Sequence, residues 1–218
     1  MIRVALVDDQ GLFRAGIRML VDSQADLEVV GEASNGQEAV AMSAETSPDV
    51  ILMDIRMPVL DGIAATAAIL AAGTAAGTTM VPRIIVLTTF DLDEAAARAI
   101  RAGASGFVLK DADPEFLLAA IRTVHAGNSV IAASATMELF EHFGRPVRAV
   151  APESFGELTA RERDIFGLAA KGLSNAEIAA EEYLSEATVK THISRILAKL
   201  ELRDRVQLVV YAFENGLR

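Results

Sequence analysis

Short apolar runs alternate with segments of helical periodicity five times in the first half of the chain. The apolar runs are Val4–Val7, Val29–Val30, Val50–Met53, Ile84–Leu87 and Gly106–Leu109. The helical segments that follow them cover residues 11–23, 35–46, 61–72, 93–102 and 114–126. Strands that alternate with helices form a parallel sheet covered on both faces. The pattern therefore predicts a doubly wound α/β domain of five strand–helix units.

The second half of the chain lacks strand signals and is predicted to be all helix. Its four predicted helices are Ala160–Lys171, Asn175–Glu182, Glu186–Glu201 and Asp204–Asn215. Thr159 and Glu162 have the spacing of a capping box at the first of these helices. Gly172 and Gly216 stand where C-terminal helix caps are expected.

Between the two halves both periodicities are lost. Glycine and proline punctuate residues 127–156, with one short helix predicted from Ala133 to Phe143. We therefore expect an α/β domain over residues 1–126, a linker over residues 127–156 and a helical domain over residues 157–218.

The net charge of −10 argues at first sight against nucleic acid as a partner, because DNA binding uses Lys and Arg. The acidity, however, belongs to the first half. Residues 1–125 hold 17 acidic and 9 basic side chains, whereas residues 187–205 hold 2 acidic and 5 basic ones. This asymmetry leaves DNA binding open for the helical half.

Several classes of protein are excluded by what the sequence lacks. The chain contains no cysteine, so disulfides, thiolate metal sites and cysteine nucleophiles are excluded. No uninterrupted apolar run is long enough to span a membrane. The first residues form a strand-like run rather than a signal peptide. We therefore expect a cytoplasmic protein with no membrane partner.

Three acidic residues directly follow two of the predicted strands. Asp8 and Asp9 follow the first strand, and Asp54 follows the third. In a doubly wound sheet the carboxyl ends of these strands are neighbours, and ligands bind there. Close carboxylates repel one another unless a cation lies among them, and hard oxygen ligands suit Mg²⁺. The sequence therefore predicts a site for Mg²⁺, or Mn²⁺ in its place.

Two more polar residues stand at the same edge of the predicted sheet. Thr88 ends the fourth strand, and Lys110 follows the fifth. Singly, each of these residues has an ordinary structural explanation as a turn, cap or strand residue. Together with the carboxylates and a cation, an ammonium and a hydroxyl provide the charge neutralisation that phosphoryl transfer requires. The five residues therefore predict a phosphoryl-transfer site.

These residues lie in motifs that resemble those of response regulator receiver domains, across residues 1 to about 125. The motifs are Asp8-Asp9, Asp54-Ile55-Arg56-Met57-Pro58, Asp61-Gly62, Thr88-Thr89 and Gly106-Phe107-Val108-Leu109-Lys110. The resemblance implies a flavodoxin-like (βα)5 receiver in which Asp54 accepts the phosphoryl group. The metal ligands that it implies are Asp54, Asp9 directly, Asp8 through water and Arg56 through its carbonyl oxygen.

The resemblance also implies roles for residues at the ends of the later strands. Lys110 and Thr88 would hold the phosphoryl oxygens, and Thr88 and Phe107 would act as switch residues. Phe107 is equally explained as a buried aromatic residue of a strand. The chain departs from many receivers in its long connection over residues 71–82 and in Asp111, where many receivers carry proline. Neither departure removes a site residue.

The helices on either side of Tyr183–Glu186 carry apolar stripes that predict packing across a tight turn. Val189, Ile193, Ile196 and Leu200 form the apolar face of the second helix. The opposite face carries Ala187, Lys190, Thr191, Ser194 and Ala198. Small, polar and basic side chains fit the major groove of DNA. A solvated face of an ordinary helical bundle would have a similar composition.

Residues 155–218 resemble the LuxR-type helix-turn-helix domain of NarL/FixJ regulators. The motifs that carry the resemblance are Leu158-Thr159-Ala160-Arg161-Glu162-Arg163, Gly172-Leu173-Ser174-Asn175-Ala176-Glu177-Ile178-Ala179 and Ser185-Glu186-Ala187-Thr188-Val189-Lys190-Thr191-His192. The resemblance implies that Lys190, Thr191 and Ser194 face DNA bases. It implies phosphate contacts for Thr188, His192, Arg195 and Lys199. The last helix resembles the one that commonly supplies a dimer interface in this family.

The two resemblances together imply a response regulator transcription factor rather than a turnover enzyme. A sensor histidine kinase would phosphorylate Asp54, and phosphorylation would control dimerisation and sequence-specific DNA binding. The implied partners are the kinase, a double-stranded DNA operator and a second copy of the chain, with RNA polymerase as a further candidate.

Two alternatives use the same residues. A phosphatase of the haloacid dehalogenase type also places an aspartate after a parallel strand near Mg²⁺, but it requires a second acid where this chain has Arg56. A receiver that acts only through protein–protein contact would keep Asp54 and use the helical half as its partner-binding surface.

Overall fold

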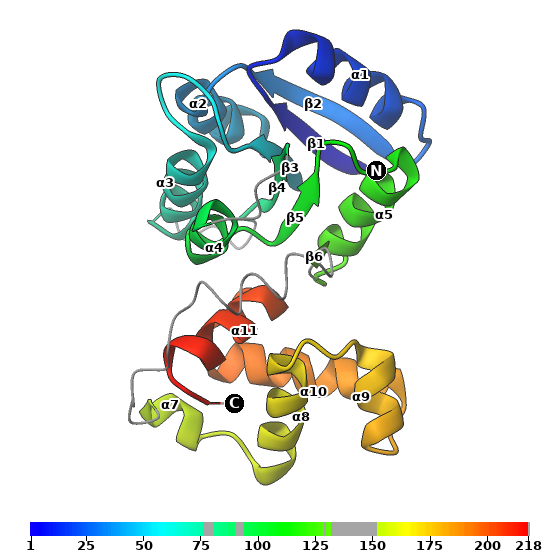
Figure 1. Cartoon of the computed structure of the whole chain (residues 1–218), viewed down its shortest axis with the longest axis vertical. Helices are drawn as coiled ribbons and strands as arrows, with labels where there is room; N and C mark the ends of the chain where they lie inside the picture. The colour runs from blue at the N-terminus through cyan, green and yellow to red at the C-terminus, as the bar shows by residue number, and fades with distance from the viewer. Residues whose placement is uncertain (76–80, 90–93, 129, 132–151, 218) are drawn as a thin grey trace. The chain divides into compact units, whose positions relative to one another are not determined.

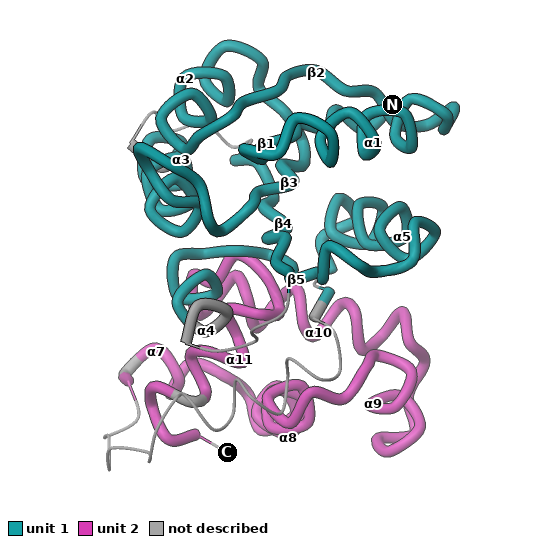
Figure 2. The backbone as a smooth tube through the Cα atoms, turned by 45° about the horizontal axis from the view of Figure 1, so that its top comes forward, with its two compact units in different colours: residues 1–138 teal, residues 139–218 magenta. Residues whose placement is uncertain are grey.

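The computed structural model describes residues 1–75, 81–89, 94–128, 130–131 and 152–217 (Figure 1). The chain divides into two compact units, Met1–Glu138 and Leu139–Arg218 (Figure 2). The helix predicted from Ala133 to Phe143 lies outside the described residues. No helix in the described part of the chain is both long and apolar enough to cross a membrane.

Unit 1 is a parallel sheet with helices on both faces, which confirms the predicted α/β class. The strand order is β2-β1-β3-β4-β5-β6. The strands are β1 Ile2–Val7, β2 Leu27–Ala33, β3 Val50–Asp54, β4 Arg83–Thr88, β5 Gly106–Leu109 and β6 Val130–Ile131. The helices are α1 Gly11–Asp22, α2 Gly36–Thr46, α3 Gly62–Ala75, α4 Glu94–Arg101 and α5 Pro114–His125.

Two hydrophobic clusters cover the two faces of this sheet. Alternate residues of a strand point to opposite faces, and on β1 Val4 and Leu6 join one cluster while Ala5 and Val7 join the other. The first of these clusters packs against α1 and α5, and the second packs against α2, α3 and α4. The sheet therefore lies between two helical layers. These layers cover its faces and not the edge at which the carboxyl ends of its strands lie.

Two features of the sheet differ from the prediction. β2 extends beyond the predicted Val29–Val30, because an edge strand is only half-buried and needs no long apolar run. β6 lies within the predicted linker and was missed. It is two residues long and pairs with β5 through Gly106 and Phe107, so no periodicity could reveal it.

Helices are the regular elements in the described part of unit 2, as predicted. Its helices are α7 Glu153–Gly156, α8 Ala160–Ala170, α9 Asn175–Glu181, α10 Glu186–Lys199 and α11 Arg205–Glu214. The predicted capping box of Thr159 and Glu162 is confirmed, and Gly172 has the positive φ of 89° expected of a C-terminal cap. The short α7 was not predicted. Its Phe155 packs edge-on against Phe166 of α8, with ring centroids 5.1 Å apart.

Candidate functional site

The predicted acidic residues lie together at the carboxyl edge of the sheet. β1 and β3 are neighbours, with Val7 paired to Met53, so the next residues, Asp8 and Asp54, lie side by side at the ends of these strands. One carboxylate oxygen from each of Asp8, Asp9 and Asp54 lies within 4.8 Å of the others. Asp8 and Asp54 are buried, whereas Asp9 is exposed to solvent. This oxygen-only donor set fits a divalent cation.

Lys110 reaches into the acidic cluster from the end of β5. Its Nζ atom lies 2.7 Å from Asp8 Oδ2 and 3.0 Å from Asp54 Oδ2, and its side chain is 7% exposed. The ring of Phe13 packs against the same ammonium, 4.9 Å from Nζ to the ring centroid. Phe13 was not singled out from the sequence, because an aromatic residue early in a helix has no distinctive signal.

The charges in the cluster shift one another's pKa values. Burial raises the pKa of Asp54, and repulsion from Asp8 adds to this effect against the opposing influence of Lys110. Burial alone would lower the pKa of Lys110, but hydrogen bonds with Asp8 and Asp54 raise it overall. The lysine therefore remains a cation at neutral pH. Its one positive charge faces three carboxyl groups, so the cluster can accept a further cation.

The other residues predicted for this site occupy the same edge or its surroundings. Thr88 is the last residue of β4, next to β3, and is 9% exposed. Phe107 on β5 is fully buried in the cluster that packs against α2, α3 and α4. The Arg56 side chain is exposed and, with Asp9 and Arg98, borders an open cavity of about 590 Å³ beside the acidic cluster.

Close packing behind β3, the strand that carries Asp54, requires a glycine. A Cβ atom on Gly62 would lie 1.9 Å from the carbonyl oxygen of Asp54, which no side chain could occupy. The Gly62 N–H donates to the Ile55 carbonyl at 2.9 Å. The glycine therefore lets the start of α3 approach the strand that carries Asp54. The sequence motif Asp61-Gly62 includes this glycine but does not show why it is required.

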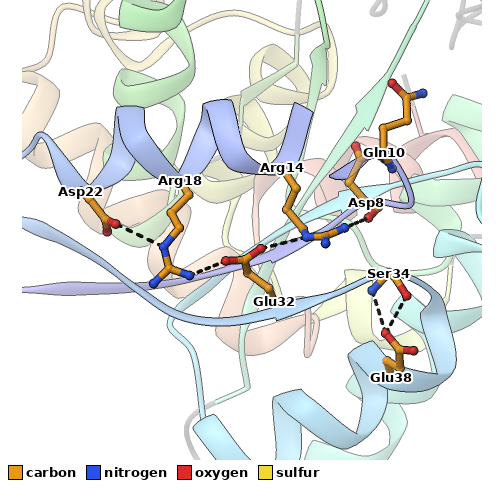
Figure 3. A network of polar contacts seen from close by, with 8 residues as sticks. All are labelled: Asp8, Gln10, Arg14, Arg18, Asp22, Glu32, Ser34 and Glu38. Carbon is orange, nitrogen blue, oxygen red and sulfur yellow. Dashed lines mark hydrogen bonds and ion pairs between the residues drawn. The ribbon is translucent and has the colours of Figure 1, made fainter. Parts of the chain in front are cut away.

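A network of charged side chains holds the loop that carries Asp8 and Asp9 (Figure 3). Arg14 on α1 donates to the Asp8 carbonyl oxygen at 2.6 Å and to Glu32 of β2 at 2.8 Å. The N–H of Gln10 donates to Asp8 Oδ1 at 2.8 Å. Arg14 could not be identified from the sequence, because its position five residues beyond Asp9 does not show that its side chain turns back to the loop.

In unit 2, the predicted DNA-facing residues share an exposed face of α10. Lys190, Thr191, Ser194 and Arg195 line a shallow groove with Ala187 and Ala198. The opposite side of the helix contributes Val189, Ile193 and Ile196 to the core. The Thr188 hydroxyl lies 2.8 Å from that of Ser185, at the start of the helix.

Two residues predicted to contact phosphates, Lys199 and His192, lie outside the α10 groove. The ammonium of Lys199 donates to buried Glu162 at 2.8 Å and to the Glu157 carbonyl at 3.1 Å, so it is bound within unit 2. His192 is half-buried, and its Nδ1 atom has no hydrogen-bond partner in the described part of the chain. Neither side chain lines the groove formed by Lys190, Thr191 and Ser194.

Comparisons with known proteins match both units. Residues 4–122 match the response regulator receiver domain, and residues 156–212 match the bacterial regulatory proteins of the luxR family. YxjL of Bacillus subtilis, named an uncharacterized transcriptional regulatory protein, is 41% identical over 99% of this chain and 97% of its own length. The response regulator VraR of Staphylococcus aureus is 39% identical over 99% of this chain and 98% of its own.

Solved structures agree with these matches. The crystal structure of ChrA, a response regulator of a heme-sensing two-component system, covers all of this chain and 98% of its own, with 37% identity and a TM-score of 0.52. RcsB of Salmonella typhimurium, at 22% identity, covers 97% of this chain and 98% of its own with a TM-score of 0.58, and supports the fold alone. The chain therefore belongs to the NarL/FixJ family of two-component response regulators, which join a receiver domain to a LuxR-type DNA-binding domain.

Proposed function

We propose that this transcriptional regulator accepts a phosphoryl group on Asp54 from a sensor histidine kinase, with Mg²⁺ or Mn²⁺ bound at Asp8, Asp9 and Asp54. The observation that carries the proposal is the position of Lys110 between two buried carboxylates, within a set of three that can share a cation. The family membership makes the chain a regulator rather than a turnover enzyme, so the phosphatase alternative is set aside.

The chain's own residues account for the steps of this transfer. An Asp54 carboxylate oxygen attacks phosphorus, the bond to the donor breaks, and the leaving group departs toward the open side of the site. Lys110 stays protonated and pairs with the phosphoryl oxygens, which Thr88 also contacts through its hydroxyl. Asp8, Asp9, Asp54 and the Arg56 carbonyl oxygen would hold the cation, which would neutralise the remaining phosphoryl charge.

The exposed face of α10 supports a role in DNA recognition for unit 2. We propose that Lys190, Thr191 and Ser194 contact bases in the major groove, and that Thr188 and Arg195 contact phosphates. Lys199 already has two acceptors within the unit, so its proposed part is to hold α10 against α8 rather than to bind a phosphate. His192 is half-buried and lies outside the groove, so its proposed part is to pack at the base of α10 rather than to bind a phosphate.

Phosphorylation is proposed to control dimerisation and hence binding to a DNA operator with paired half-sites. A phosphoryl group adds negative charge and strong acceptors at Asp54, which can draw Thr88 inward and reorder the end of β4. A few kcal/mol of differential stabilisation would move an active state from minor to major.

Substitution of the phosphoacceptor tests this function. We expect Asp54→Asn to abolish phosphoryl incorporation from acetyl phosphate, measured by intact-protein mass spectrometry and by phosphate-affinity gels. Asp61→Asn is the matched control, because Asp61 is an exposed acid at the end of the loop that follows β3. An amide oxygen preserves its role as acceptor of a hydrogen bond from the Ala64 N–H. Incorporation retained in Asp54→Asn, or lost in both variants, would disprove the assignment of Asp54.

A further inference from the structure

We propose that Arg14 is a positioning residue of the metal site, which fixes the peptide group between Asp8 and Asp9 and so sets the direction of the Asp9 carboxylate. The inference rests on the proposed function, since it concerns the cation that Asp8, Asp9 and Asp54 would share. Arg14 touches none of the reacting atoms. Its effect would pass through the backbone of the loop.

Arg14 contacts the backbone of the loop directly. Arg14 Nη1 donates to the Asp8 carbonyl oxygen at 2.6 Å (Figure 3). That oxygen belongs to the peptide group that joins the two acids, so the guanidinium restrains rotation of this group. A charge-assisted hydrogen bond of this length is stronger than one between neutral groups.

The position of the Asp9 side chain depends on its backbone more than that of Asp8 does. Asp8 is held by Lys110, by the Gln10 N–H at 2.8 Å and by its own N–H, which donates to the Ala33 carbonyl at 3.1 Å. The Asp9 side chain is exposed, and no hydrogen bond to it is found among the residues that the structure describes. Only the backbone of Asp9 is restrained, so the peptide group that Arg14 holds limits the positions that its carboxylate can reach.

The Arg14 side chain is itself held in place by an acidic partner. Its Nε donates to Glu32 Oε2 at 2.8 Å, and Arg18 donates to the other oxygen of Glu32. Arg18 Nε also lies 3.4 Å from Asp22 (Figure 3). The two arginines and two carboxylates balance in charge. The influence of Arg14 on the acidic cluster is therefore mainly geometric, as expected of a residue that orients the ligands of a metal.

The test compares two arginines that share Glu32. We expect Arg14→Met to weaken Mg²⁺ binding about tenfold, the lower range for loss of a residue that orients metal ligands. Arg18→Met removes an equal charge from the same helix and the same partner without touching the loop, and it should change the affinity less than about twofold. Binding of MgCl₂ to the full chain is measured by isothermal titration calorimetry, with no phosphodonor present.

Two more variants separate positioning from a loss of fold. Arg14→Lys can reach only one of the two acceptors, so its affinity should lie between those of the wild type and Arg14→Met. Glu32→Gln loosens the guanidinium without removing it, and it should weaken Mg²⁺ binding by about threefold, a fraction of the full effect. Thermal unfolding in a chelator shows whether each variant is folded, and the Mg²⁺-induced rise in Tm should be smaller for Arg14→Met than for Arg18→Met.

The outcomes distinguish this inference from the proposed function. If the wild type binds Mg²⁺ and Arg14→Met binds it as tightly as Arg18→Met does, the inference is wrong and the proposed function stands. If Arg14→Met does not fold, an unchanged affinity in Glu32→Gln overturns the inference instead. If the wild type binds no Mg²⁺, both proposals fail.

Discussion

Lys110 is the residue that links the two buried carboxylates of the acidic cluster. Its ammonium lies within 3.0 Å of both Asp8 and Asp54, and hydrogen bonds with them keep its pKa raised in spite of burial. We expect Lys110→Met, which keeps the apolar stem, to slow phosphoryl incorporation from acetyl phosphate about a hundredfold, the usual cost of removing one preorganised donor. The rate is measured on phosphate-affinity gels at saturating MgCl₂.

The control for this variant is Arg122→Met, which removes the α5 cation of an exposed ion pair with Asp26. Its rate should equal that of the wild type. An unchanged rate in Lys110→Met, or an equal loss in both variants, would count against a direct role of Lys110 in the transfer.

The residues of the acidic cluster differ in how far the sequence could predict them. Asp8, Asp54 and Lys110 could be grouped because parallel strands end at one edge, and the structure brings them together. Arg14 and Gly62 could not. Their roles depend on where a long side chain turns and on a backbone approach that leaves no room for a Cβ atom.

Lys190 and Arg195 are the two basic residues that line the exposed α10 groove. We expect Lys190→Ala to weaken binding to the specific operator about tenfold, within the range of about 1–3 kcal/mol for a base contact. Lys171→Ala is the matched control, because Lys171 is an exposed lysine just after α8 and outside this groove. Titration by fluorescence anisotropy at fixed salt checks the prediction, and equal affinities for the two variants would refute it.

At the scale of the elements, the pair of Glu162 and Lys199 joins the start of α8 to the end of α10. Glu162 is 4% exposed and also accepts from the N–H and hydroxyl of Thr159. The hydrogen bond from Lys199, followed by the one from the Thr159 N–H, lowers the pKa of Glu162 to about 2. The sequence indicated that Lys199 lies on the same helix as Lys190 but could not show that its partner is in another helix.

The lowered pKa fixes the sign of a pH effect on unit 2. Because the folded pKa of Glu162 is about 2 and its ordinary value is 4.5, its stabilisation is complete above about pH 4.5 and is lost as the pH falls toward 2. We expect Glu162→Gln to destabilise α8 and α10 by about 1–2 kcal/mol at neutral pH, with the difference from the wild type shrinking in acid. Hydrogen exchange of peptides from these helices in the full chain measures it.

Glu177→Gln provides the comparison for this prediction. Glu177 forms the same type of capping box with Ser174 at the start of α9, but its side chain is exposed. Among the described residues it has no ion pair like the one between Glu162 and Lys199. Its loss of protection should therefore be smaller. Equal losses in the two variants would mean that capping, rather than the ion pair, accounts for the stabilisation.

The elements that the sequence missed are the shortest ones. β6 has two residues and α7 has four, so neither reaches the length at which an apolar period becomes visible. Both are specified by tertiary partners, β5 for the strand and Phe166 for the helix. The longer helices and buried strands were predicted because each shows its period over several residues, even where its bounds shifted by a few positions.

At the scale of the whole molecule, the uneven charge of the chain bears on dimerisation. Residues 1–125 carry 17 acidic against 9 basic side chains, so two receivers that approach each other repel, and phosphorylation of Asp54 adds to this charge. For a dimer to form on phosphorylation, the free energy of its contacts must therefore exceed that of the charge repulsion. Salt screens that repulsion, while it weakens the contacts of basic side chains with DNA.

We therefore expect opposite effects of salt on the two associations of the phosphorylated chain. Between about 50 and 200 mM NaCl, the dimer fraction in sedimentation velocity should rise while affinity for a single operator half-site falls, because only the first association brings like charges together. Asp54→Asn should stay monomeric throughout, and Asp61→Asn should follow the wild type. A phosphorylated sample that remains monomeric at both salt concentrations would remove dimerisation from the proposed mechanism, while the half-site titration would still report on α10 alone.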